Sequence, residues 1–129
     1  MDIKKRVLIV TDGTDSIKAI ADSIVSCLQG NDIKICPAEK FAGTDLLPAH
    51  IFFLGCEKPN PDSFLYLSQM LGHINLAGRR CGVFSNNGKA LKYLSGLFKS
   101  SEAVLDELLI ANAGKIKQAD VKKWLKGIL

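Results

Sequence analysis

Hydroxyl and carboxylate side chains gather in one short turn near the start of the chain, T-D-G-T-D-S at residues 11–16. Such side chains are preferred where helices begin, because their oxygens accept hydrogen bonds from the first backbone N–H groups. The N–H groups that stay unpaired there attract anions, including phosphate. The competing interpretation is that these side chains only cap a helix. The residues predicted to bind phosphate are Thr11, Asp12, Gly13, Thr14, Asp15 and Ser16.

The segments on either side of the turn have the pattern that this chemistry needs. Residues 7–10 form a continuous apolar run, which is typical of a strand buried on both faces of a parallel sheet. After the turn, apolar residues recur at helical spacing over residues 17–28. A strand, a turn and a helix in this order would present unpaired N–H groups at one end of a sheet.

The rest of the chain repeats this alternation of strand and helix. Strands are predicted at residues 33–36, 50–55 and 80–85, and helices at residues 61–71, 90–99 and 118–128. Residues 39–48 are expected to be irregular, with at most one helical turn. Residues 103–110 are ambiguous, because their composition suits a helix whereas the alternation requires a strand. The pattern predicts an α/β fold, a doubly wound five-stranded parallel sheet in a three-layer α/β/α sandwich.

The helical spacing also predicts which side chains face the core. In the helices at residues 61–71 and 118–128, the expected inward-facing residues are Phe64, Leu65, Leu67, Met70, Leu71, Val121, Trp124, Leu125 and Ile128. Among the four cysteines, Cys27, Cys36 and Cys81 are predicted to be core thiols. The cysteines lie far apart without a C-x-x-C pair, which argues against a disulfide framework and against a zinc or other metal site.

Length, composition and charge narrow the class of protein. With 129 residues, of which 47% are hydrophobic, the chain is predicted to be a single domain over residues 1–129. Its apolar runs are too short to span a bilayer, so we expect a soluble, cytoplasmic protein without membrane contact. The net charge of +4 comes without a nucleic-acid-binding motif, and nucleic acid is not expected as a partner. The excess lysines form either a solvated basic face or a docking surface for an acidic partner.

Two further loops are predicted to join the phosphate-binding turn. In doubly wound sheets ligands bind beyond the carboxyl ends of the strands, where the strand order reverses. The loops that follow the strands at residues 50–55 and 80–85 therefore meet the turn at one edge. A left-handed turn is expected at residues 86–88, and Cys56 is expected to be partly exposed. The predicted binding residues of these loops are Cys56, Glu57, Lys58, Pro59, Asn60, Ser85, Asn86, Asn87 and Gly88.

Over nearly its whole length the chain resembles the short-chain flavodoxins. The resemblance lies in V-L-I-V-T-D-G-T-D-S-I-K-A-I-A, H-I-F-F-L-G-C, L-A-G-R-R-C-G-V-F-S, V-L-D-E-L-L-I and the terminal helix with Trp124. In that family a T/S-x-T-G-x-T loop wraps the phosphate of FMN, and the next two loops sandwich the flavin ring. Thr11 and Ser16 fall on the first and last hydroxyl positions, whereas the central Thr-Gly is replaced by Gly13-Thr14. The chain also departs from the family in Asp12 and Asp15, in its basic charge, and in a second loop without Trp or Tyr.

The resemblance implies FMN as cofactor and an electron-transfer function. Such a protein shuttles electrons between a reductase and an acceptor enzyme as a monomer or weak dimer, and it is an electron carrier rather than a stand-alone enzyme. No catalytic residues are then required, because the flavin carries the chemistry. The alternative is an interaction or regulatory domain that keeps the flavodoxin-like fold without flavin. A phosphoacceptor receiver domain is disfavoured, because the strand at residues 50–55 is followed by Cys56 and not by an aspartate.

Overall fold

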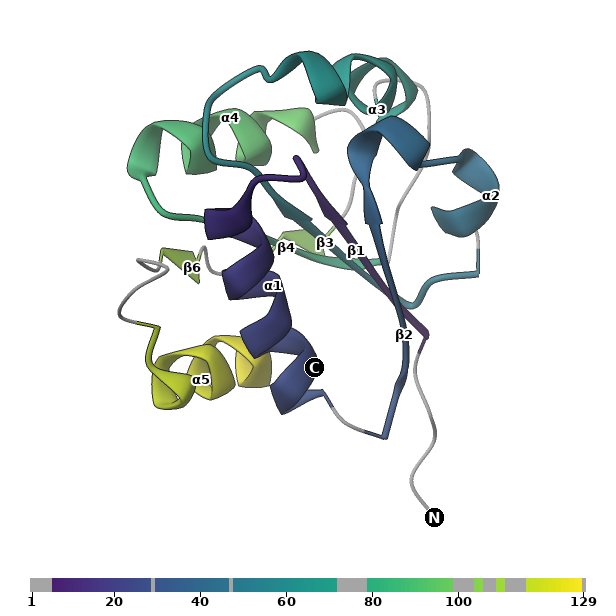
Figure 1. Ribbon diagram of the computed structural model, residues 1–129. Helices are drawn as coiled ribbons and strands as arrows, with labels where there is room; N and C mark the ends of the chain where they lie inside the picture. Colours follow the sequence, from purple (N-terminus) through teal and green to yellow (C-terminus); the bar gives the residue numbers. More distant parts are fainter. Residues whose placement is uncertain are drawn as a thin grey trace.

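The computed structural model describes residues 6–28, 30–46, 48–71, 79–98, 104–105, 109–110 and 116–128. Strands and helices alternate along these ranges (Figure 1). The strands are β1 (Arg6–Thr11), β2 (Asp32–Pro37), β3 (Ile51–Gly55), β4 (Arg80–Ser85), β5 (Val104–Leu105) and β6 (Leu109–Ile110). The helices are α1 (Asp15–Cys27), α2 (Gly43–Leu46), α3 (Leu65–Leu71), α4 (Gly88–Leu97) and α5 (Gln118–Ile128), with short 3₁₀ helices η1 (Ala38–Lys40) and η2 (Asp62–Phe64).

All strands pair in parallel in one sheet, in the order β2-β1-β3-β4-β5. The strand β6 also pairs in parallel with β4. The ambiguous residues 103–110 thus contribute two short strands, both beside β4, and the predicted doubly wound parallel sheet is confirmed. Because consecutive parallel strands need crossover connections, the helices of the crossovers cover both faces of the sheet.

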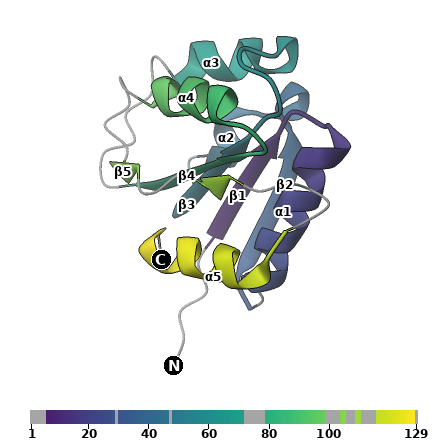
Figure 2. The ribbon, with the colours of Figure 1, turned by 90° about the vertical axis from the view of Figure 1, so that its left-hand side faces the viewer.

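The central strands are buried on both faces, as their apolar runs predicted. The side chains of Val7 and Ile9 face the layer formed by α1 and α5, whereas those of Leu8 and Val10 face the layer formed by α2, α3 and α4. Figure 2 shows the two helical layers on opposite sides of the sheet. No helix in the described ranges is both long and apolar enough to cross a membrane.

One side chain that was expected in the core lies at the surface, and another is only partly buried against the core. Leu65 is 66% exposed, because the buried stripe of this segment runs through Phe64, Leu67 and Leu71 and leaves Leu65 beside it. Cys27 ends α1 and is only partly buried; its thiol donates a hydrogen bond to Oε1 of Gln118 at 2.8 Å. Among the other predicted core residues, Cys36, Cys81, Val121, Trp124 and Leu125 are buried and Met70 is partly buried, whereas the side chain of Ile128 lies outside the described part of the structure.

Candidate functional site

Three loops meet at the carboxyl edge of the sheet, where the strand order reverses between β1 and β3. We name them loop 1 (residues 11–16), loop 2 (residues 56–61) and loop 3 (residues 85–88). The register pairs Thr11 with Gly55 and Gly55 with Phe84, so the three strands end at the same level. The structure thus brings together the three segments that contain all of the predicted site residues.

Loop 1 delivers unpaired backbone N–H groups at the start of α1. Gly13 has a φ of +83°, a left-handed conformation that suits glycine, and its N–H donates to Oγ1 of Thr11 at 3.3 Å. Thr14 is the N-cap, and the first helical hydrogen bond runs from the N–H of Lys18 to the carbonyl of Thr14 at 2.9 Å. The N–H groups of residues 15–17 precede that bond and have no acceptor in the described part of the chain.

The hydroxyl of Ser16 is a fourth unpaired donor in this loop. Its Oγ atom has less than 1 Å² of accessible surface and no hydrogen-bond partner within the described ranges. A buried polar atom without a partner carries a free-energy cost, and most such atoms in proteins are paired. One helical turn therefore contains a hydroxyl and three N–H groups without acceptors in the ranges that the structure describes.

Asp12 links loop 1 to loop 2, which the sequence did not indicate. Its Oδ1 accepts hydrogen bonds from the N–H and Oγ1 of Thr14, at 3.0 and 2.7 Å. Its Oδ2 accepts one from the N–H of Glu57, at 2.8 Å. The carboxylate therefore neither points to solvent nor stays within its own loop. Asp15, in contrast, is exposed in the first turn of α1.

Loops 2 and 3 are joined by two short hydrogen bonds. Oγ of Ser85 donates to the carbonyl of Cys56, and Nδ2 of Asn87 donates to the carbonyl of Glu57, both at 2.6 Å. Oδ1 of Asn87 also accepts from the N–H of Ala90 at 2.9 Å and so caps α4. The peptide groups of Glu57 are thus held from loop 1 on one side and from loop 3 on the other.

The predicted left-handed turn at residues 86–88 is wrong. Asn87 has extended backbone, with a φ of −155°, because an N-cap side chain reaches the helix only from an extended residue. In the described part of the chain a positive φ outside glycine occurs at Asn60, between two prolines of loop 2. Asparagine tolerates that conformation better than most residues do.

Cys56 was expected to be partly exposed and is buried. Burial, with the nearby charge of Asp12 as a smaller cause, raises the pKa of its thiol to about 12. The thiol stays protonated at neutral pH, so Cys56 is not a reactive nucleophile. Burial also raises the pKa of the neighbouring Tyr93, whose hydroxyl has no partner among the described residues. Tyr93 lies on α4 and was not among the predicted site residues.

The outer part of loop 2 is open. Lys58, Pro59 and Asn60 are exposed, and Glu57 and Asn86 are partly buried. A hollow of about 220 Å³ adjoins this loop and is lined by residues 60–62 and by Leu65. Loops 1, 2 and 3 contain no aromatic side chain, so no residue in them stacks on a ring.

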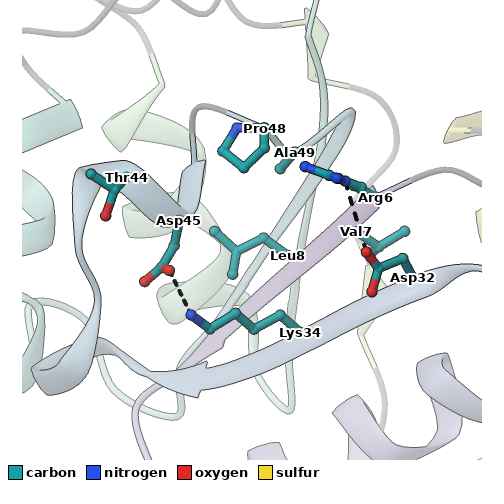
Figure 3. A pocket seen from close by; sticks show the side chains of 9 residues that line it. All are labelled: Arg6, Val7, Leu8, Asp32, Lys34, Thr44, Asp45, Pro48 and Ala49. Atoms are coloured by element: carbon teal, nitrogen blue, oxygen red, sulfur yellow. Dashed lines mark hydrogen bonds and ion pairs between the residues drawn. The ribbon is translucent and has the colours of Figure 1, made fainter.

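A second cavity, of about 200 Å³, lies at the opposite end of the strands (Figure 3). Its charged groups are already paired, because Arg6 lies 3.8 Å from Asp32 and Lys34 lies 2.5 Å from Asp45. The Lys34 ammonium lowers the pKa of the Asp45 carboxyl through their hydrogen bond. Since the cations there are matched by carboxylates, the cavity is a poorer phosphate site than loop 1.

Comparison with known proteins identifies the fold. No protein-family model and no curated protein matches the chain. A flavodoxin from Streptococcus pneumoniae TIGR4 superposes with a TM-score of 0.80 at 18% identity, over 95% of this chain and 96% of that chain. A short-chain flavodoxin associated with a PDU bacterial microcompartment gives a TM-score of 0.80 at 15% identity, over 98% and 97%. A Fusobacterium nucleatum flavodoxin variant bound to flavin mononucleotide gives a TM-score of 0.76 at 12% identity, over 98% of this chain and 96% of that chain. This chain therefore has the flavodoxin-like fold.

Proposed function

We propose that the chain binds FMN across loops 1, 2 and 3 and acts as an electron-transfer protein. The observation that carries the proposal is a group of donors at the start of α1 that have no acceptor among the described residues, the N–H groups of residues 15–17 and Oγ of Ser16. A phosphate monoester offers several acceptor oxygens and would satisfy these donors together. The structural neighbours support the proposal, since they are flavodoxins and one is bound to flavin mononucleotide.

In this proposal each loop has a separate task. Loop 1 would hold the phosphate, and loops 2 and 3, tied together through Ser85 and Asn87, would hold the flavin ring. FMN supplies the electron-transfer chemistry when bound, and the chain supplies binding and orientation. Without an aromatic side chain in these loops, the ring would be held by backbone groups, Lys58 and the asparagines.

The proposed partners are a reductase and an acceptor enzyme, met by diffusion in the cytoplasm. Lys58 on loop 2 and Lys89 on α4 are exposed at the site edge. Positive charge there favours partners with acidic surfaces, because complementary charge speeds encounter. We propose that the chain works as a monomer or weak dimer, which leaves this edge open to both partners in turn.

A second candidate function is a flavin-free interaction or regulatory domain. It is favoured by one observation: the Asp12 carboxylate already accepts hydrogen bonds from Thr14 and Glu57 within the loops that would hold FMN. Loops fastened to each other by their own side chains can persist without a cofactor. The two candidate functions differ in whether purified protein takes up flavin.

Flavin titration separates the two functions. We expect purified protein to quench the fluorescence of added FMN, and Ser16→Ala to weaken FMN binding about threefold to tenfold by removing one hydrogen bond to the phosphate. Riboflavin, which lacks the phosphate, is the matched control and should bind the wild type and Ser16→Ala equally. The unliganded variant should be no less stable, because it loses only a hydroxyl without a partner. Absence of binding at about 1 mM FMN, which means a binding free energy less favourable than about −4.1 kcal/mol, would rule out the electron-carrier proposal.

A further inference from the structure

We propose that the Asp12 carboxylate is an internal anion that occupies part of the phosphate site, and that it thereby sets how strongly the chain prefers phosphorylated over unphosphorylated flavin. The inference rests on the proposed function, because it concerns the same loop. It assigns to Asp12 a role in ligand selectivity that is separate from helix capping, since Asp12 precedes the N-cap Thr14.

The hydrogen bonds of Asp12 are those that a bound anion would make. The carboxylate accepts hydrogen bonds from the N–H of Thr14, the hydroxyl of Thr14 and the N–H of Glu57, at distances from 2.7 to 3.0 Å. These distances are typical of hydrogen bonds to a charged acceptor. Two of the three donors belong to loop 1, so a ligand phosphate in this loop would compete with Asp12 for them.

Asp12 occupies only part of the phosphate site, and the donors that it leaves unpaired indicate a ligand. The carboxylate does not reach the N–H groups of residues 15–17, and Oγ of Ser16 remains buried without a partner in the described part of the chain. A phosphate can therefore either bind beside the Asp12 charge or displace it. The first is opposed by repulsion between like charges, and the second breaks three hydrogen bonds. Either way, part of the affinity for phosphate is lost.

Asp12 also couples the phosphate site to the ring site. The residue that donates its N–H to Asp12, Glu57, accepts a hydrogen bond from Asn87 through its carbonyl. Displacing Asp12 would release loop 2 on one side while loop 3 still holds it on the other. Riboflavin, which needs no phosphate site, leaves this chain of contacts intact.

The test is the ratio of the riboflavin Kd to the FMN Kd, because both ligands contain the same ring and the ratio measures what the phosphate adds to binding. We expect a ratio below about ten in the wild type, and a rise of about tenfold or more in Asp12→Ala, which frees the loop 1 donors for the phosphate. Asp12→Asn keeps an acceptor for Thr14 but loses the charge and the bond from Glu57, and its ratio should be intermediate. Asp15→Asn is the matched control, since it removes one charge from the same loop at an exposed position; its ratio should rise about threefold or less.

A titration with inorganic phosphate, followed by the backbone amide NMR signals of residues 14–17, makes the test independent of flavin. Phosphate should shift these signals at lower concentration in Asp12→Ala than in Asp15→Asn. Urea unfolding establishes whether each variant is folded. If Asp12→Ala does not fold, the same comparison is made with Asp12→Asn. The inference would be overturned if phosphate affinity and the Kd ratio rose no more in Asp12→Ala than in Asp15→Asn. Tighter phosphate binding in Asp12→Ala without flavin binding by any variant would instead rule out the proposed function and the flavin preference, while the occupation of the anion site by Asp12 would still hold.

Discussion

The packing around Gly55 leaves no room for a side chain, and substitution of this residue by alanine gives a quantitative prediction. It ends β3 directly before loop 2. A Cβ atom placed there would lie 2.3, 2.4 and 2.8 Å from three ring atoms of Phe84. That ring is fully buried and packs edge to face on Trp124, at a centroid distance of 6.5 Å. The ring therefore cannot move aside unless α5 moves as well.

The size of the effect follows from two opposing terms. Overpacking of a buried site costs about 1–3 kcal/mol, and three contacts below 3 Å place Gly55→Ala near the upper end. Replacing glycine also lowers the entropy of the unfolded chain, which offsets about 0.4–1 kcal/mol. We expect a net loss of about 2 kcal/mol in the free energy of unfolding, and a fall in Tm of roughly 6–10 °C for a chain of this length.

Urea unfolding of four proteins measures this prediction. The matched control is Gly96→Ala on α4, which is exposed with no atom within 4 Å of the new Cβ, and which should gain about 0.5 kcal/mol. Phe84→Leu should recover part of the loss when combined with Gly55→Ala, because the smaller side chain leaves room for the new methyl group. A stability of Gly55→Ala within about 0.5 kcal/mol of the wild type would refute the packing argument.

Two further predictions concern thiols and pH. In native protein at pH 8, a thiol reagent should modify Cys27, which is partly exposed, and leave Cys56 unmodified, because Cys56 is buried and burial raises its pKa to about 12; mass spectrometry after labelling locates the reaction, and rapid labelling of Cys56 would contradict the buried placement. For Asp45, whose pKa is lowered by the hydrogen bond from Lys34, the stabilisation is present above the carboxyl pKa of the unfolded chain and is lost as the pH falls through the folded value. Asp45→Asn should thus lower the unfolding free energy at pH 7, and the loss should shrink as the pH falls below the carboxyl pKa of the unfolded chain. Urea titrations at a series of pH values would show this, and a loss that does not change with pH would disprove the ionic contribution.

Local patterns in the sequence determined the elements and their order. The strand at Arg80–Ser85 and the helix at Gln118–Ile128 match the predicted ranges residue for residue, because an apolar run or a helical stripe is encoded by neighbouring residues. Parallel strands with crossover helices then allow few topologies. Because ligands of such sheets bind beyond the carboxyl ends of the strands, the loops that contain the predicted site could also be named from the sequence. Leu65 was misplaced, because burial at the edge of an apolar stripe depends on what packs against it.

The chemistry inside the site was decided by the tertiary structure. Asp12 and Glu57 are 45 residues apart and Asn87 and Glu57 are 30 apart, so their hydrogen bonds exist only because β1, β3 and β4 end side by side. The sequence shows that Asp12 lies in a turn of phosphate-binding type, but the partner of its carboxylate belongs to another loop. Side chains that act across loops carry no periodic signal, since each bond depends on strand register and not on spacing along the chain.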